Sequence, residues 1–78
     1  MAKNFIAYEK SNGNILMSIN GGDDTLSVEG ARKVFQINPT VRNGLAEIVE
    51  INQTDATMVK GNKQGYKYDV ATSTIVKK

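Results

Sequence analysis

The sequence contains no histidine, cysteine or tryptophan, and only one proline in 78 residues. Without cysteine the chain has no disulfide, no thiol nucleophile, no cysteine-based zinc site and no iron–sulfur cluster. Without histidine it lacks the side chain that most often serves as a general base near neutral pH. These absences point away from an enzyme and from a bound cofactor.

Long hydrophobic runs and a strong excess of one charge are also missing. No segment approaches the roughly 20 apolar residues of a membrane-spanning helix, and the first residues lack the apolar core of a signal peptide. The net charge is +2, with 40% hydrophobic and 23% charged residues, which is ordinary globular usage. We therefore expect one domain over residues 1–78, made in a cytoplasm, with no membrane partner and no small-molecule substrate.

The apolar residues that are present are mostly β-branched. Seven Ile and seven Val stand against three Leu, and eight Asn and seven Gly accompany them. β-branched side chains suit a pleated, half-buried surface, and Asn and Gly suit turns. The predicted fold class is α+β and β-dominated, a small antiparallel sheet or sandwich of hairpins with at most one short helix.

The segment from residue 3 to residue 19 predicts a β-hairpin, because Asn12-Gly13 is a strong signal for a two-residue type I′ turn. That turn collects the apolar side chains on one face and opposes Tyr8 to Met17 and Ile6 to Ile19. A register shifted by one residue opposes Ile6 to Ser18 and divides the apolar set between two faces. Since such a slip would remove the core face, we predict the type I′ register.

The middle of the chain is less regular. Thr25–Val28 predicts a short strand, and Arg32–Asn38 predicts another, with Phe35 and Ile37 on one face. Pro39, which has no backbone N–H, ends that strand or marks a sheet edge. Leu45–Ile51 fits both helical and strand spacing, and its shortness and β-branched content favour a strand.

The last third of the chain predicts a helix and a second hairpin. Asn52–Gly61 reads as the one short helix, with Asn52 as its N-cap and Asp55 near the positive end of the helix dipole. Tyr66–Val70 alternates as a strand, and Ile75-Val76 forms the final one after a four-residue loop, 71–74. Two turns of helix are unstable alone in water, so we expect the helix to pack on the sheet.

No constellation predicts catalytic, metal or cofactor residues. Asp23-Asp24 is the only adjacent acidic pair, and no further acid is spaced to complete an oxygen cage for a cation. The Gly61–Gly65 segment superficially resembles a phosphate-binding loop but lacks the Gly-Lys-Ser/Thr ending. We interpret the first as a solvated loop and the second as a helix stop and connector.

The C-terminal end is basic. Residues 60–78 hold five Lys against one Asp, a net charge of +4, while the rest of the chain is −2. Lysines beside aromatic side chains on a strand bind single-stranded nucleic acid by phosphate contacts and base stacking. The residues of this alternative site are Lys60, Lys63, Tyr66, Lys67 and Tyr68. The opposing interpretation places both tyrosines in the core, as ordinary strand alternation does.

The segment Tyr8–Leu16, with an aromatic, an acid, a turn ending in Gly and an Ile-Leu pair, resembles the hairpin that opens many small structural proteins of tailed bacteriophages. The closing segments Val49–Asn52, Tyr66–Asp69 and Ile75–Lys78 are similar to how such chains end. The resemblance implies a virion component, such as a tail, neck, fibre or head-accessory subunit, located in the virion. It implies assembly with itself and with other virion proteins, and it supplies no functional residues.

The leading prediction is therefore a non-enzymatic structural or interaction protein that works by oligomeric assembly. Small sheets expose unpaired backbone groups at their edges, and assembling proteins use such edges for partners. The predicted contact residues are Phe5 and Leu16, which lie together on the second face of the hairpin. The alternative prediction is a small nucleic-acid-binding module that uses the basic C-terminal segment.

Overall fold

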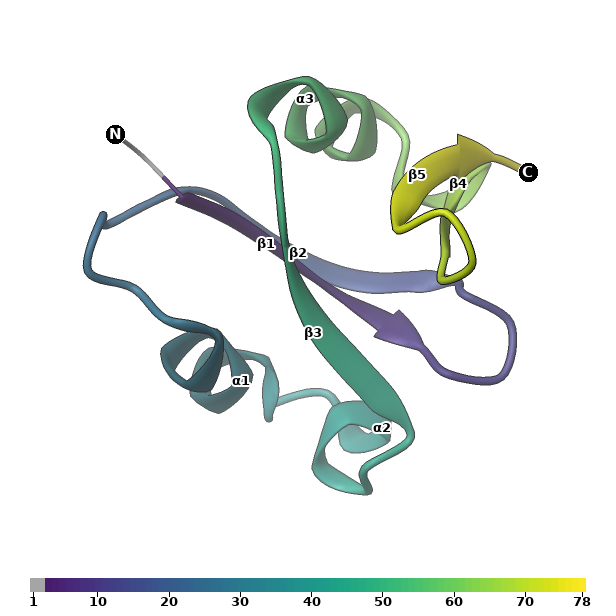
Figure 1. The fold of residues 1–78 in the computed structure, drawn as a ribbon. Coiled ribbons are helices and arrows are strands. Elements are labelled where there is room, and N and C mark those ends of the chain that lie inside the picture. Colours follow the sequence, from purple (N-terminus) through teal and green to yellow (C-terminus); the bar gives the residue numbers. More distant parts are fainter. Residues whose placement is uncertain (1–2) are drawn as a thin grey trace.

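The computed structural model describes residues 3–78 and has the predicted α+β class (Figure 1). Of the described residues, 39% lie in strands and 32% in helices. The strands form two antiparallel sheets, one of three strands and one of two. The expectation of at most one short helix is wrong, because the described residues form three α-helices and one 3₁₀ helix. The elements are β1 (Lys3–Glu9), β2 (Ile15–Gly22), α1 (Val28–Phe35), α2 (Pro39–Arg42), β3 (Ala46–Ile51), α3 (Gln53–Gly61), η1 (Lys63–Gly65), β4 (Tyr66–Asp69) and β5 (Thr74–Lys77).

Strand β1 is the centre of the molecule. It pairs antiparallel with β2 on one side and with β3 on the other. Every residue from Asn4 to Tyr8 is buried. Because successive side chains of a strand point to opposite faces, unbroken burial means that both faces of this sheet are covered.

The β1–β2 hairpin forms, but its predicted register is wrong: by one residue over residues 5–7, and by two at Tyr8, which pairs with Ile15 and not with Met17. Ile6 pairs with Ser18 and Ala7 with Met17. The connecting loop is longer than a type I′ turn: the Glu9 N–H donates to the Asn14 carbonyl at 2.8 Å. Asn12 is not among the residues with positive φ, which a type I′ turn would require of it.

Two-sided coverage explains the register. Leu16 is an extra residue in β2, between the pairs Ala7–Met17 and Tyr8–Ile15. Such a bulge changes which face the following side chains occupy. The apolar residues of the hairpin can be divided between its two faces without loss of core contacts, because each face packs against its own hydrophobic core. The type I′ register would be needed to keep one core face only if the other face of the hairpin met water.

Helix α1 replaces the predicted strands Thr25–Val28 and Arg32–Asn38. Ser27 caps it, since the Gly30 N–H donates to the Ser27 side-chain oxygen at 3.2 Å. Ala31 and Phe35, four residues apart, are fully buried on one face of the helix. Ile37, predicted to share a strand face with Phe35, is 75% exposed because it lies beyond the helix.

Pro39 begins α2; it neither ends a strand nor lies at an edge. The Asn38 side chain accepts a hydrogen bond from the Thr40 N–H at 2.9 Å, and proline is well suited to the first helical turn, where no N–H is needed. The strand predicted over Leu45–Ile51 is confirmed as β3.

The predicted C-terminal elements are confirmed. Helix α3 follows its cap, Asn52, whose side chain accepts from the Asp55 N–H at 2.7 Å. Strands β4 and β5 pair antiparallel, from Tyr66 with Lys77 to Asp69 with Thr74. The connecting loop has the expected four residues but runs over 70–73, one residue earlier than predicted.

Each face of the central sheet has a separate hydrophobic core, and Figure 1 shows α1 and α2 on one side and α3 with β4–β5 on the other. The core under α1 and α2 consists of Phe5, Ala7, Ala31, Phe35, Val41, Ala46 and Ile48. The core under α3 and β4–β5 consists of Ile6, Tyr8, Ile15, Ile51, Ala56, Val59, Tyr68 and Ile75.

Backbone hydrogen bonding connects the two sheets where the β1–β2 loop meets β4. Asn14, just before β2, forms a bridge with Lys67 of β4, and the Tyr68 N–H donates to the Gly13 carbonyl at 2.8 Å. The strands therefore follow one another in the order β3-β1-β2-β4-β5. Strands β3 and β5 stand at the two ends of this series.

Candidate interaction surfaces

The predicted contact residues differ in burial: Phe5 lies in the core, and Leu16 is half-buried. Phe5 is 1% exposed and belongs to the core under α1 and α2. Leu16 is half-buried and packs against the same core. The prediction of Phe5 as a contact residue is corrected to a core role, because α1 and α2 cover the face that the sequence analysis had left open.

The predicted nucleic-acid residues do not form a stacking platform. Lys60, Lys63 and Lys67 are exposed but lie on three successive elements, α3, η1 and β4. Tyr66 is half-buried and packs against the core, and Tyr68 is only 8% exposed. Base stacking requires an accessible ring face, so Tyr68 is excluded from this role.

Tyr68 instead stacks on Tyr8. Their ring centroids are 4.5 Å apart with an interplanar angle of 26°, which connects β4 to the central strand. Burial raises the pKa of the Tyr8 phenol above 10.0, and the charges of Glu47 and Tyr68 add to this rise. This pair is a structural joint between the two sheets.

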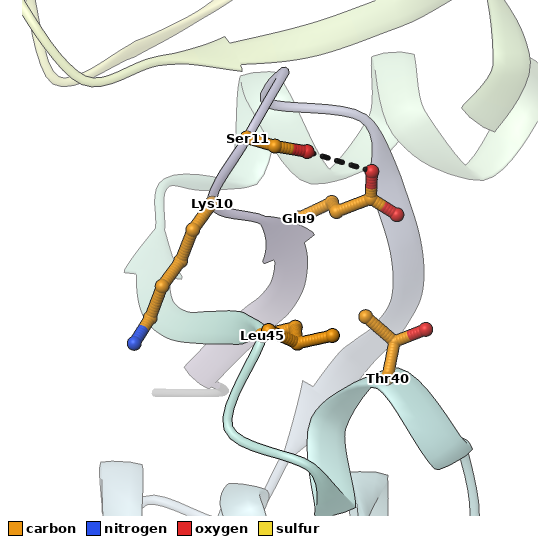
Figure 2. A pocket seen from close by; sticks show the side chains of 5 residues that line it. All are labelled: Glu9, Lys10, Ser11, Thr40 and Leu45. Carbon is orange, nitrogen blue, oxygen red and sulfur yellow. Dashed lines mark hydrogen bonds between the residues drawn. The ribbon is translucent and has the colours of Figure 1, made fainter.

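A surface pocket of about 460 Å³ lies beside the β1–β2 loop (Figure 2). In Figure 2, Leu45 and Thr40 point toward each other while Lys10 extends away from them. Leu45 is 58% exposed, so the pocket has one apolar wall. The lining residues are Glu9, Lys10, Ser11, Thr40 and Leu45.

The polar groups of this pocket hold the loop together. The Ser11 hydroxyl donates to the Glu9 carboxylate at 3.0 Å, and the Asn12 side-chain amide donates to the same oxygen at 2.8 Å. These hydrogen bonds are exposed to solvent, and no imidazole or thiol accompanies them. The hydrogen bonds stabilise the turn, and the arrangement offers a contact surface with no activated nucleophile.

A second pocket, of about 280 Å³, lies on the other side of the same loop, where it meets β4. Val70 lines it and is 61% exposed. Lys10 and Ser11 line both pockets, so the two pockets adjoin the same loop. Each pocket has one exposed aliphatic side chain in its lining, Leu45 in the first and Val70 in the second.

The acidic residues of residues 3–78 form no group of three or more that could hold a metal ion. The Asp23 carboxylate accepts hydrogen bonds from the Thr25 N–H at 2.8 Å and the Thr25 hydroxyl at 2.9 Å. These bonds lower the pKa of Asp23. They make the predicted acidic loop a tight turn that leads into α1.

The outer edge of β3 carries unpaired backbone groups. Backbone groups of an antiparallel strand point alternately toward the partner and away from it. The Lys10 N–H donates to the Leu45 carbonyl at 2.9 Å, which continues the β1–β3 register. Counting by twos from Leu45, the backbone groups of Glu47 and Val49 face β1, and those of Ile48 and Glu50 face outward.

Strand β5 has an outer edge of the same kind. The Lys78 N–H donates to the Gly65 carbonyl at 3.0 Å, which continues the β4–β5 register. By the same count, Val76 faces β4, and Ile75 and Lys77 direct their N–H and C=O outward. Within residues 3–78 neither β3 nor β5 has a second strand partner.

The two edges carry opposite charge. Strand β3 holds Glu47 and Glu50 and no basic residue, while Lys77 and Lys78 follow one another at the end of β5. Glu50, Lys77 and Lys78 are exposed, and the Glu47 side chain is 44% exposed and 3.3 Å from the Lys10 ammonium. Sequence reasoning found the basic end but missed its counterpart, because strand order is needed to show that β3 lies at an edge.

Comparisons of the chain with protein-family models, with curated proteins and with solved structures find no match. No helix within residues 3–78 is long and apolar enough to cross a membrane.

Proposed function

We propose that this chain is a non-enzymatic structural protein that acts by assembly with copies of itself and with other proteins. The observation that supports this most is the pair of unpaired strand edges, β3 and β5. An unpaired edge is a row of backbone donors and acceptors ready to bind another strand. Charged side chains on both edges restrict which strand can add.

Size and composition support the same proposal. A domain of about this length buries only roughly 60–65% of the surface of its unfolded chain, so contacts between subunits add stability that its own cores cannot. The exposed aliphatic side chains of Leu45 and Val70, beside the two pockets, offer further contact area. The resemblance of the Tyr8–Leu16 hairpin to those of small phage structural proteins supports a role as a virion component.

Size-exclusion chromatography with light scattering tests the proposal. The purified chain is measured in low salt from about 1 µM to about 1 mM, a range that covers weak and moderate affinities. We expect the mass per particle to rise above that of the monomer with concentration. A monomer throughout this range, together with no assembly on mixing with candidate partner proteins, would refute the proposal.

The same measurement separates assembly from nucleic-acid binding. With Tyr68 buried, a bound strand would depend on lysine–phosphate contacts, and its affinity would fall steeply with salt. A protein that stays monomeric and elutes with added single-stranded DNA at low salt would indicate the nucleic-acid function instead.

A further inference from the structure

We infer that copies of this chain associate head to tail, with β5 of one copy adding antiparallel to the outer edge of β3 of the next. This inference rests on the proposed assembly function and names the two surfaces that meet. It follows from the backbone direction of the two edges, from the side chains on them and from their opposite charge.

The backbone groups of the two edges match. Outward-facing residues occur at every second position on each strand, so an antiparallel pair forms when one outward set opposes the other. This condition is met when Lys77 opposes Ile48 of the next copy and Ile75 opposes Glu50 of that copy. Both pairs then exchange hydrogen bonds through backbone groups that have no partner within residues 3–78.

The side chains suit this register as well. Val76 lies opposite Val49 of the next copy, a pair of β-branched residues that are both half-buried in the isolated chain. Lys78 lies opposite Glu47, and Lys77 lies diagonal to Glu50 on the same face. Opposite charges at directly and diagonally opposed positions of a sheet attract one another.

Pairing of like edges is disfavoured by the same charges. A two-fold β3–β3 contact would bring four glutamates together, two from each copy, and a β5–β5 contact would bring together four lysines. Like charges across a sheet contact are destabilising. Because the favoured contact joins two different surfaces, it leaves one free edge at each end, and the assembly grows into a closed ring or a filament.

Paired charge reversals test the inference. The first variant carries Glu47→Lys with Glu50→Lys, and the second carries Lys77→Glu with Lys78→Glu. Each reversal turns two attractive pairs into repulsive ones, which should lower the association constant by about tenfold or more at low salt. An equimolar mixture of the two variants restores opposite charges at every contact, so we expect assembly to return.

The control is Lys60→Glu with Lys63→Glu. It changes the net charge by the same amount as the second variant, at exposed positions on α3 and η1 that belong to neither edge strand. We expect it to assemble like the wild type. Circular dichroism of every variant verifies that the fold is intact.

Lys77→Pro, compared with Lys77→Gln, which removes the same charge but keeps the N–H, tests the backbone part of the inference. The Lys77 N–H faces outward, so proline removes one donor of the contact while the β4–β5 hydrogen bonds remain. We expect a folded chain with reduced association. In the wild type, amide exchange at Ile75, Lys77, Ile48 and Glu50 should slow as concentration rises.

The outcomes separate the inference from the proposed function. Loss of assembly in both charge variants and its return in the mixture support head-to-tail pairing. A wild type that assembles while both variants assemble equally well overturns the inference and leaves the assembly function standing. Loss of assembly in both variants without its return in the mixture also overturns the inference. A wild type that never assembles overturns both.

Discussion

Replacement of Phe35 by alanine is the sharpest test of how the middle of the chain folds. Phe35 is 0% exposed and lies at the end of α1 in the core with Phe5 and Ala7. Truncating a buried phenylalanine to alanine costs about 3–5 kcal/mol, through lost transfer free energy and the cavity left behind. A domain of this length has a total stability of roughly 4–12 kcal/mol, so this one change removes a large part of it.

Ile37→Ala is the matched control. Ile37 is 75% exposed, and its truncation should change the free energy of unfolding by less than about 0.5 kcal/mol. If residues 32–38 formed a strand with both side chains on one face, the two substitutions would have comparable effects. Helix α1 instead predicts a large difference between them.

Urea unfolding followed by circular dichroism measures both variants. If Phe35→Ala is unfolded without urea, Phe35→Leu, with an expected loss of about 1 kcal/mol, keeps the comparison measurable. Equal midpoints for the alanine variants would refute both the helix and the separate core beneath it.

Two further predictions concern the joint between the sheets. Gly13 has φ of 78° and an added Cβ would collide with the Tyr68 carbonyl oxygen, whereas Gly21, with φ of 74°, has open space. Gly21→Ala should therefore cost only the left-handed backbone penalty of about 1–2 kcal/mol, and Gly13→Ala clearly more, as thermal unfolding will show; equal losses would contradict the joint. Because the pKa of Tyr8 is higher in the folded chain than in the unfolded chain, its neutral phenol favours the folded state. This contribution to the free energy of unfolding is fully present below pH 10.0 and is lost as the pH rises through the folded pKa. Tyr8→Phe should lack this alkaline loss in urea titrations across that range, and identical pH profiles would refute it.

The register of the first hairpin shows where reasoning from local pattern fails. Asn12-Gly13 identified the turn, and β1 and β2 form on either side of it. The register followed from covering both faces of β1, and the elements that cover them begin at Val28 and at Gln53. A pattern within the hairpin contains no information about segments so far along the chain.

Helix α1 was missed for a related reason. Its local signals were present: Ser27 at the cap, Leu26 before it in position to pack on Ala31, and buried positions four residues apart. The alternation of Phe35 and Ile37 favoured a strand over these helix signals. A short segment can fit both the strand period of two residues and the helix period of 3.6 residues. Only contact with the sheet distinguishes the buried member, Phe35, from the exposed one.

The elements that could be read directly were those whose hydrogen bonds close within a few residues, such as the Asn52 cap of α3 and the four-residue turn between β4 and β5. The α+β class could be predicted from composition because the preference of a residue for strand, helix or turn is a local property of its backbone and side chain. Register, the helix over Val28–Phe35 and the identity of the two free edges depend on contacts between distant segments. Those two edges make up the candidate interaction site. The site could not be predicted from the sequence, because the order of the strands in space decides which strands lie at an edge.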